Sequence, residues 1–168
     1  MSVKFQVQMT DKYMYDFMLY HNYTHASGLM SAIAGVLCFA VFLTKISSGD
    51  MQSSVLWLMC SIIMLIMNPQ NMKSKAKMQV KNTPMFQKPL EYEIHEDGIT
   101  VRQDDQEVSN TWEEFTKAVS TGKSILLYLG RVRAIILPKE CMGEEYEQVL
   151  KMIHTHIPAN KVKIRHIH

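Results

Sequence analysis

The sequence predicts an α+β membrane protein, in which a two-helix transmembrane hairpin is inserted near the start of a small antiparallel β-sheet domain closed by a C-terminal α-helix. Three observations predict this fold class: two long uncharged segments, short segments of alternating apolar and polar residues after them, and an amphipathic helical pattern near the end. The 168 residues suffice for one ordinary domain or two small ones. Charged residues make up 20% and hydrophobic residues 47% of the chain, which excludes a disordered or fibrous protein.

Residues 1–25 predict a strand followed by an interfacial helix. From Lys4 to Thr10, polar and apolar side chains alternate, as in a half-buried strand. Thr10 or Asp11 can cap a helix over residues 11–25. The aromatic residues of this helix are Tyr13, Tyr15, Phe17, Tyr20 and Tyr23. Because tyrosine suits the headgroup layer of a membrane, we expect an interfacial anchor here, and an aromatic ligand site is the alternative.

Residues 26–68 predict the transmembrane hairpin, with spans at about 27–45 and 53–68. No charge occurs from Ala26 to Thr44, a run of 19 residues, or from Met51 to Met72, a run of 22. A helix of 19 residues extends about 28 Å, close to the roughly 30 Å hydrocarbon core of a bilayer. The alternative is a pair of core helices in a soluble protein. The rest of this short chain has too little apolar surface to cover them.

Four lysines follow the second apolar segment, whereas the loop between the two segments carries one. These four are Lys73, Lys75, Lys77 and Lys81. The positive-inside rule therefore predicts a multi-pass protein of the cell membrane with both termini in the cytoplasm. Each juxtamembrane lysine gains about 1 kcal/mol near anionic lipid, so the four are candidates for electrostatic contact with the membrane surface. A purely topogenic role is the alternative.

Residues 69–168 predict a cytoplasmic β-sheet domain that ends in a helix. Alternation and turn residues predict strands at 90–95, 99–102, 108–112, 125–129 and 132–137. Apolar residues at the spacing of one helical face predict a helix at about 140–157. Because both ends of the hairpin are expected on the same side of the membrane, the opening strand can join this sheet.

The chain resembles a known family in several segments. They are KFQVQMT, TDKYMYDFMLYHNY, the two apolar segments, YEIHEDGITVRQDDQEVSNTWEEFTKAV and ILLYLGRVRAIILPKE. In this order they resemble the YcxB-like family of small bacterial membrane proteins. The resemblance implies a C-terminal part similar to bacterial pleckstrin-homology-like domains, a small curved sheet capped by a helix. It implies neither catalytic residues nor an established function.

The motifs that could carry chemistry are weak. Ser120–Ser124 resembles the end of a phosphate-binding loop, but Lys117 stands where that loop needs its first glycine, so a hairpin turn is expected. The pair His21/His25 has no acidic or cysteine partner in its pattern, and the pair His166/His168, on an extended tail, could bind a metal only weakly and adventitiously. No activating arrangement surrounds the three cysteines, Cys38, Cys60 and Cys141. We therefore predict no catalytic residue, no bound metal and no cofactor.

Two function classes remain after these exclusions. The first is a membrane-tethered binding or regulatory module, whose partners are the bilayer, anionic lipid headgroups and an unknown protein. The second is an accessory subunit of a small membrane assembly or transporter. Small residues in the first span, Ser31, Ala32, Ala34 and Gly35, would permit close helix packing in a homo-oligomer or within the hairpin. An enzyme is not expected, and a net charge of +2 argues against a dedicated nucleic-acid binder.

Overall fold

The computed structural model describes residues 2–164, and the chain divides into two compact units. One unit combines Met1–Phe17 with Lys77–His168, and the other is Met18–Ala76. The second unit is therefore an insertion into the first. The two boundaries between the units fall within α1 (Asp11–Thr24) and α4 (Asn68–Asn82).

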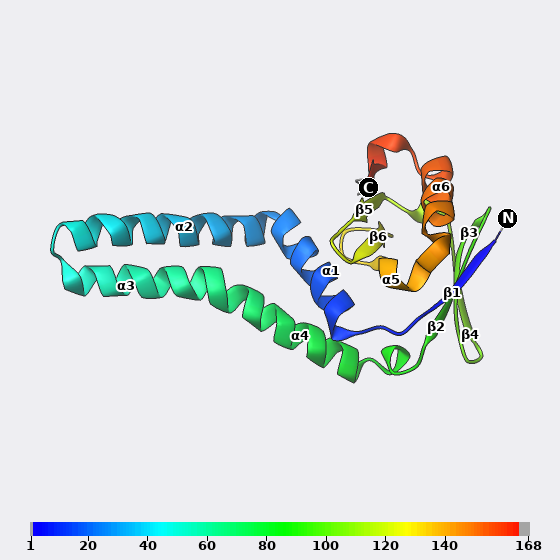
Figure 1. Ribbon diagram of the computed structural model, residues 1–168, viewed down its shortest axis with the longest axis horizontal. Coiled ribbons are helices and arrows are strands. Elements are labelled where there is room, and N and C mark those ends of the chain that lie inside the picture. The colour runs from blue at the N-terminus through cyan, green and yellow to red at the C-terminus, as the bar shows by residue number, and fades with distance from the viewer. Residues whose placement is uncertain (1, 165–168) are drawn as a thin grey trace. The chain divides into compact units, whose positions relative to one another are not determined.

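The first sheet joins the opening strand to the strands that follow the insertion (Figure 1). Its strands are β1 (Val3–Val7), β2 (Leu90–His95), β3 (Gly98–Gln103) and β4 (Gln106–Thr111), in that order and antiparallel throughout. The expectation that the opening strand can join the sheet is thus confirmed, because Val3 pairs with Ile94 and Val7 with Leu90.

The register of this sheet separates an apolar face from a polar face. Across the four strands, Phe5, Tyr92, Val101 and Val108 lie opposite one another in one row. Because alternate residues of a strand point to opposite faces, the neighbouring rows, which include Lys4 and Glu93, lie on the other face.

The second sheet was not expected, because the sequence predicted a single sheet. Its strands are β5 (Lys117–Ser120), β6 (Ser124–Tyr128), β7 (Ala134–Pro138) and β8 (Val162–Lys163), in the order β7-β6-β5-β8. A 3-10 turn at Trp112–Glu114 redirects the chain after β4, so that β5 pairs with β6 and not with β4. The turn is held by Trp112, whose indole Nε1 donates to the carbonyl of His95 at 3.0 Å. The sequence also missed β8, which runs parallel to β5.

The C-terminal helix is broken, contrary to the single helix predicted at 140–157. It consists of α5 (Lys139–Met142), a 3-10 turn (Gly143–Glu145) and α6 (Tyr146–His156). Gly143 has a φ of 50°, in the left-handed region that interrupts a helix and that glycine adopts readily. Both sheets and α6 bury one apolar core, in which Phe115, Ile125 and Ile153 are almost fully inaccessible.

The inserted unit contains two helices that lie side by side (Figure 1). They are α2 (Ala26–Ser47) and α3 (Met51–Ile62), and α3 continues through a π-helical turn (Ile63–Met67) into α4. Asp50 caps α3 by accepting from the amide of Ser53 at 3.2 Å. The π-turn ends two residues before Pro69, which has no amide hydrogen to continue the α-helical ladder and whose ring would clash with the carbonyl of Leu65 in a regular α-helix.

Small and polar side chains bring the two helices together. A Cβ added to Gly35 would lie 2.7 Å from Leu65 Cγ, so the glycine permits this close approach. Asn68 Nδ2 donates to Ser31 Oγ at 3.1 Å, and Ser54 and Ser61 are buried. Gly35 and Ser31, two of the small residues of the first apolar helix, therefore pack within the hairpin.

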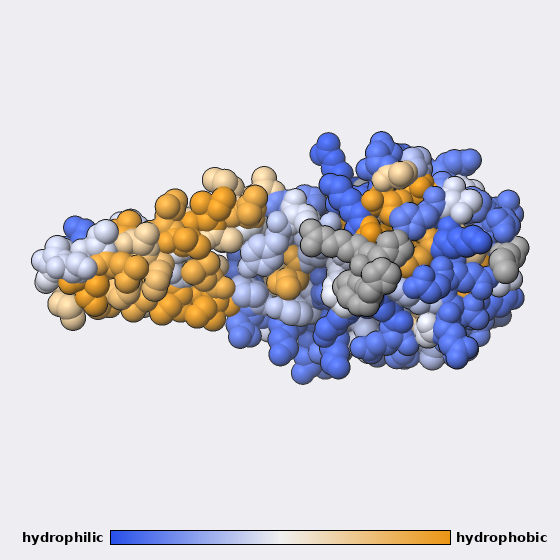
Figure 2. All heavy atoms as spheres, turned by 45° about the horizontal axis from the view of Figure 1, so that its top comes forward, coloured by the Kyte–Doolittle hydropathy of each residue, from blue (hydrophilic) through white to orange (hydrophobic). Residues whose placement is uncertain are grey.

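Among residues 2–164, two helices are long and apolar enough to cross a membrane, Gly28–Ser47 and Met51–Asn82. The second is longer than the predicted span of 53–68, because the helix does not end at Pro69. Their most apolar windows have mean hydropathies of 2.1 and 1.6, yet only 6% and 11% of these windows are buried within the protein. Figure 2 shows this apolar surface, which is interrupted at the polar loop between the helices.

We expect Gly98→Ala to destabilise the β-sheet unit. A Cβ at Gly98 would lie 2.0 Å from the backbone oxygen of Asn110, which the pairing of β3 with β4 holds in place. The cost should be about 1–3 kcal/mol of unfolding free energy, as for other overpacked sites, measured by denaturant titration in mild detergent. Gly122→Ala is the matched control, because no atom lies within 4 Å of the added Cβ. Equal stability of the two variants would contradict the strand register described above.

Candidate functional site

An apolar groove of about 440 Å³ lies between the two sheets. One wall comes from the apolar row of the first sheet, with Tyr92, Val101 and Val108, and the other from β7. Met14 and Phe17 of α1 and the segment around Phe86 complete the lining. Its volume lies in the range of about 300–1,000 Å³ typical of small-molecule sites.

The turn between β6 and β7 places one cation at this groove and a second close to it in the sequence. Arg133 is the one charged side chain among the described residues that line it, and Arg131 lies two positions earlier. Both side chains are exposed, and within residues 2–164 neither takes part in an ion pair. Val132 lies between them and is 67% exposed. Residues 132–137 were predicted to form a strand, and this site was not predicted, although an apolar residue between two arginines after Gly130 was a visible signal.

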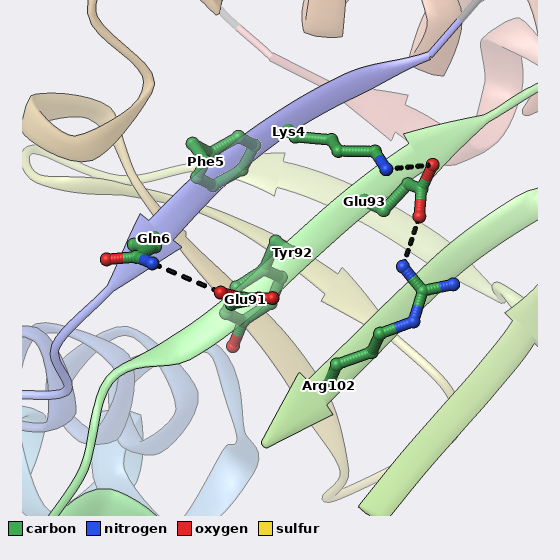
Figure 3. A pocket seen from close by; sticks show the side chains of 7 residues that line it. All are labelled: Lys4, Phe5, Gln6, Glu91, Tyr92, Glu93 and Arg102. Atoms are coloured by element: carbon green, nitrogen blue, oxygen red, sulfur yellow. Dashed lines mark hydrogen bonds and ion pairs between the residues drawn. The ribbon is translucent and has the colours of Figure 1, made fainter. Parts of the chain in front are cut away.

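A second, polar recess of about 200 Å³ lies over β1, β2 and β3 (Figure 3). Lys4 Nζ lies 3.1 Å from Glu93 Oε1, and Arg102 binds the other oxygen of Glu93. Arg102 also donates from Nε to Glu107 at 2.9 Å. The ring of Phe5 stacks on Tyr92, with centroids 5.7 Å apart.

The charges of this recess neutralise one another. The hydrogen bonds from Arg102 and Lys4 lower the pKa of Glu93, which keeps the carboxylate ionised and occupied. A general acid or base needs a pKa near the working pH and a free position for substrate. Glu93 has neither, so the recess is a cross-strand ion-pair network and not a catalytic centre.

The start of α1 is held by polar contacts with α5 and with the turn between β5 and β6. Tyr13 donates to Glu140 Oε2 at 3.1 Å, and Thr121 donates to Asp16. Lys139 Nζ donates to the carbonyl of Thr121 at 2.7 Å. Ser120–Ser124 forms the turn between β5 and β6, as predicted, and is closed by the Ser124 amide donating to Thr121 Oγ1 at 3.0 Å.

Burial suppresses the reactivity of two groups near this contact. It raises the pKa of the Cys141 thiol, and burial together with the hydrogen bond to Glu140 raises the pKa of Tyr13 to about 12. Both groups are therefore neutral near pH 7 and are poor nucleophiles.

The four predicted membrane-surface lysines all lie on α4 and are exposed. Lys73, Lys77 and Lys81 follow one another at intervals of four residues and share a helix face, whereas Lys75 points away from that face. Their contact with lipid stays a prediction.

The histidine pairs are less informative. The rings of His21 and His25 lie 4.1 Å apart, and His166 and His168 lie outside the described residues. Within residues 2–164, no three His, Cys, Asp or Glu side chains are placed to share a metal ion.

Comparison with known proteins finds a match to part of the β-sheet unit. The model of a family described as YcxB-like protein matches residues 94–153. This segment is similar to the YcxB-like family. It runs from β2 to α6 and includes β3–β7, so the resemblance noted in the sequence is confirmed here. No curated protein and no solved structure matches the chain significantly.

The buried Tyr13 predicts a pH dependence of stability. Its pKa is raised from 10.0 to about 12 in the folded chain, so its contribution is fully present below pH 10 and is lost as the pH rises toward 12. The unfolding free energy of the wild type should therefore fall relative to that of Tyr13→Phe over this range, as followed by urea titration in mild detergent. Tyr15→Phe, on the same helix but without the bond to Glu140, should keep the wild-type slope. Parallel profiles of wild type and Tyr13→Phe would contradict the buried hydrogen bond.

Proposed function

We propose that the protein is a membrane-tethered binding module. Its helical hairpin spans the cell membrane, and its β-sheet unit is a pleckstrin-homology-like domain that faces the cytoplasm with both termini. A shared core of two sheets and one C-terminal helix, together with the YcxB-like match, supports this domain type.

The exposed apolar surface of the hairpin carries the proposal. Met30, Leu37 and Leu56 are each more than 60% exposed, and large apolar side chains follow the whole length of α2 and α3. Such a surface is unfavourable in water at about 25 cal/mol per Å², whereas hydrocarbon accepts it. The 20 residues of Gly28–Ser47 extend about 30 Å, the thickness of the hydrocarbon core.

The pairing of β1 with β2 supports an even number of spans. Val7, at the end of β1, pairs with Leu90, at the start of β2, so the chain leaves the sheet and returns to it at the same end. An insertion at this point has to bring the chain back to the side from which it started. Two helices that cross in opposite directions meet this condition.

The chemistry of the β-sheet unit supports binding over catalysis. The carboxylate of Glu93 forms ion pairs with Lys4 and Arg102 and is not free to bind a substrate. The thiol of Cys141 is held neutral by burial. The groove, in contrast, exposes apolar side chains to solvent. An exposed apolar groove with a charged rim is typical of a recognition site.

Val36→Lys tests the membrane location of the hairpin. Val36 is 58% exposed in α2, so a lysine there would be harmless in water but costs about 3 kcal/mol at the centre of a membrane helix. We expect wild-type protein to stay in the membrane pellet after an alkaline carbonate wash and the pellet fraction of Val36→Lys to fall sharply. Ile46→Lys, near the end of α2, is the control, because its ammonium group can reach the interface. Release of the wild-type chain by carbonate would overturn the proposal.

The orientation is tested with single cysteines in a chain whose three native cysteines are replaced by serine. Ser48→Cys reports on the loop between the spans, and Gly122→Cys reports on the β5–β6 turn. A membrane-impermeant maleimide should label Ser48→Cys in intact cells and Gly122→Cys only after lysis. Changing the four α4 lysines to glutamine should weaken this asymmetry, since they supply the positive-inside signal. The reverse labelling pattern in the lysine-containing chain would contradict a cytoplasmic β-sheet unit.

A further inference from the structure

We propose that the groove between the two sheets binds one anionic phospholipid of the bilayer, with an acyl chain in the groove and the phosphate on Arg131 and Arg133. The proposal deepens the proposed function and rests on it, because the lipid comes from the membrane that holds the hairpin. It assigns a ligand to residues distinct from the four lysines of α4.

The distribution of exposed apolar side chains points to an apolar ligand. In the described part of the β-sheet unit, the large apolar residues with high exposure are Met78, Met85, Val108 and Val132. All but Met78 line the groove. A patch of this kind, gathered at one concave site and left open by the fold, is typical of a binding surface.

The charge at the rim points to an anionic group on that ligand. Arg131 and Arg133 have no ion-pair partner among residues 2–164, unlike Arg102, which binds two glutamates. A guanidinium group presents a planar set of donors that matches phosphate oxygens. A ligand that satisfies both features is amphipathic and negatively charged, with its polar end at the turn.

The position of the groove in the chain points to the membrane as the source. Phe17 and Gln79 both line it, and the chain passes into the inserted hairpin after Phe17 and returns at Lys77. The groove thus includes residues of α1 and α4, the two helices within which the chain enters and leaves the inserted unit. The turn at residues 131–133 has an exposed valine between two arginines. This composition suits the boundary between lipid headgroups and acyl chains.

Photocrosslinking of the full-length chain in lipid nanodiscs tests the proposal. A photoreactive phenylalanine analogue replaces Met85 at the groove, and the products are identified by mass. One nanodisc contains phosphatidylglycerol in phosphatidylcholine, and the other contains phosphatidylcholine alone. We expect a protein–phosphatidylglycerol adduct that falls by roughly tenfold or more in Arg131→Gln/Arg133→Gln, the loss expected for two charge-assisted contacts.

Matched variants distinguish binding at this site from a general effect of surface charge or of apolar surface. Lys123→Gln removes an exposed cation from the β5–β6 turn and should leave the adduct unchanged. Val108→Glu places a charge on the exposed groove wall and should abolish the adduct without loss of folding, because the side chain is 47% exposed. Carbonate washing of the same variants gives an independent readout of membrane insertion.

Three results would overturn the proposal. Equal adduct yields with both lipid mixtures would exclude a specific anionic site. An equal loss of the phosphatidylglycerol adduct in Lys123→Gln and in the arginine variant would exclude it as well. Crosslinks to protein alone, in a chain that resists carbonate, would overturn the lipid ligand and leave the proposed membrane function in place. Loss of the wild-type chain from the membrane would overturn both.

Discussion

The pairing of β1 with β2 is the constraint on which the rest of the structure depends. Five residue pairs, from Val3 with Ile94 to Val7 with Leu90, join strands that the insertion separates in sequence. Because neighbouring antiparallel strands have opposite directions, the two ends of the insertion are held at one end of the sheet. Everything between them has to leave and return at that place, which a helical hairpin does with two helices. Closing so long a connection costs entropy, and the shared core that buries Val3 and Val7 offsets it.

The elements with a local signal were predictable, and their assembly was not. Alternation located β1, β2 and β3, and the absence of charge located α2 and α3. The division into two sheets depends on the turn at Trp112, whose indole reaches the carbonyl of His95 across the first sheet. No local pattern encodes that contact. The break in the C-terminal helix depends on the backbone conformation of Gly143, and glycines within a helical pattern are often tolerated.

The candidate site was missed for a related reason. In sequence, Tyr92, Val101 and Val108 are ordinary strand residues, and only the register places them in one row against β7. Residues of β4 are mostly exposed because β4 is an edge strand, so its valine stays accessible where a central strand would have buried it. The lysines of α4, in contrast, were visible as a cluster because a single helix carries them.

The two proposals are physically connected through α1. This helix supplies Met14 and Phe17 to the groove, and its chain continues into the hairpin. Tyr13 bonds Glu140 of α5, and Asp16 bonds Thr121 in the β5–β6 turn, so the first turns of α1 are held in place. A ligand in the groove would therefore contact a part of α1 that two hydrogen bonds already hold in place. Binding would require little further ordering of this helix.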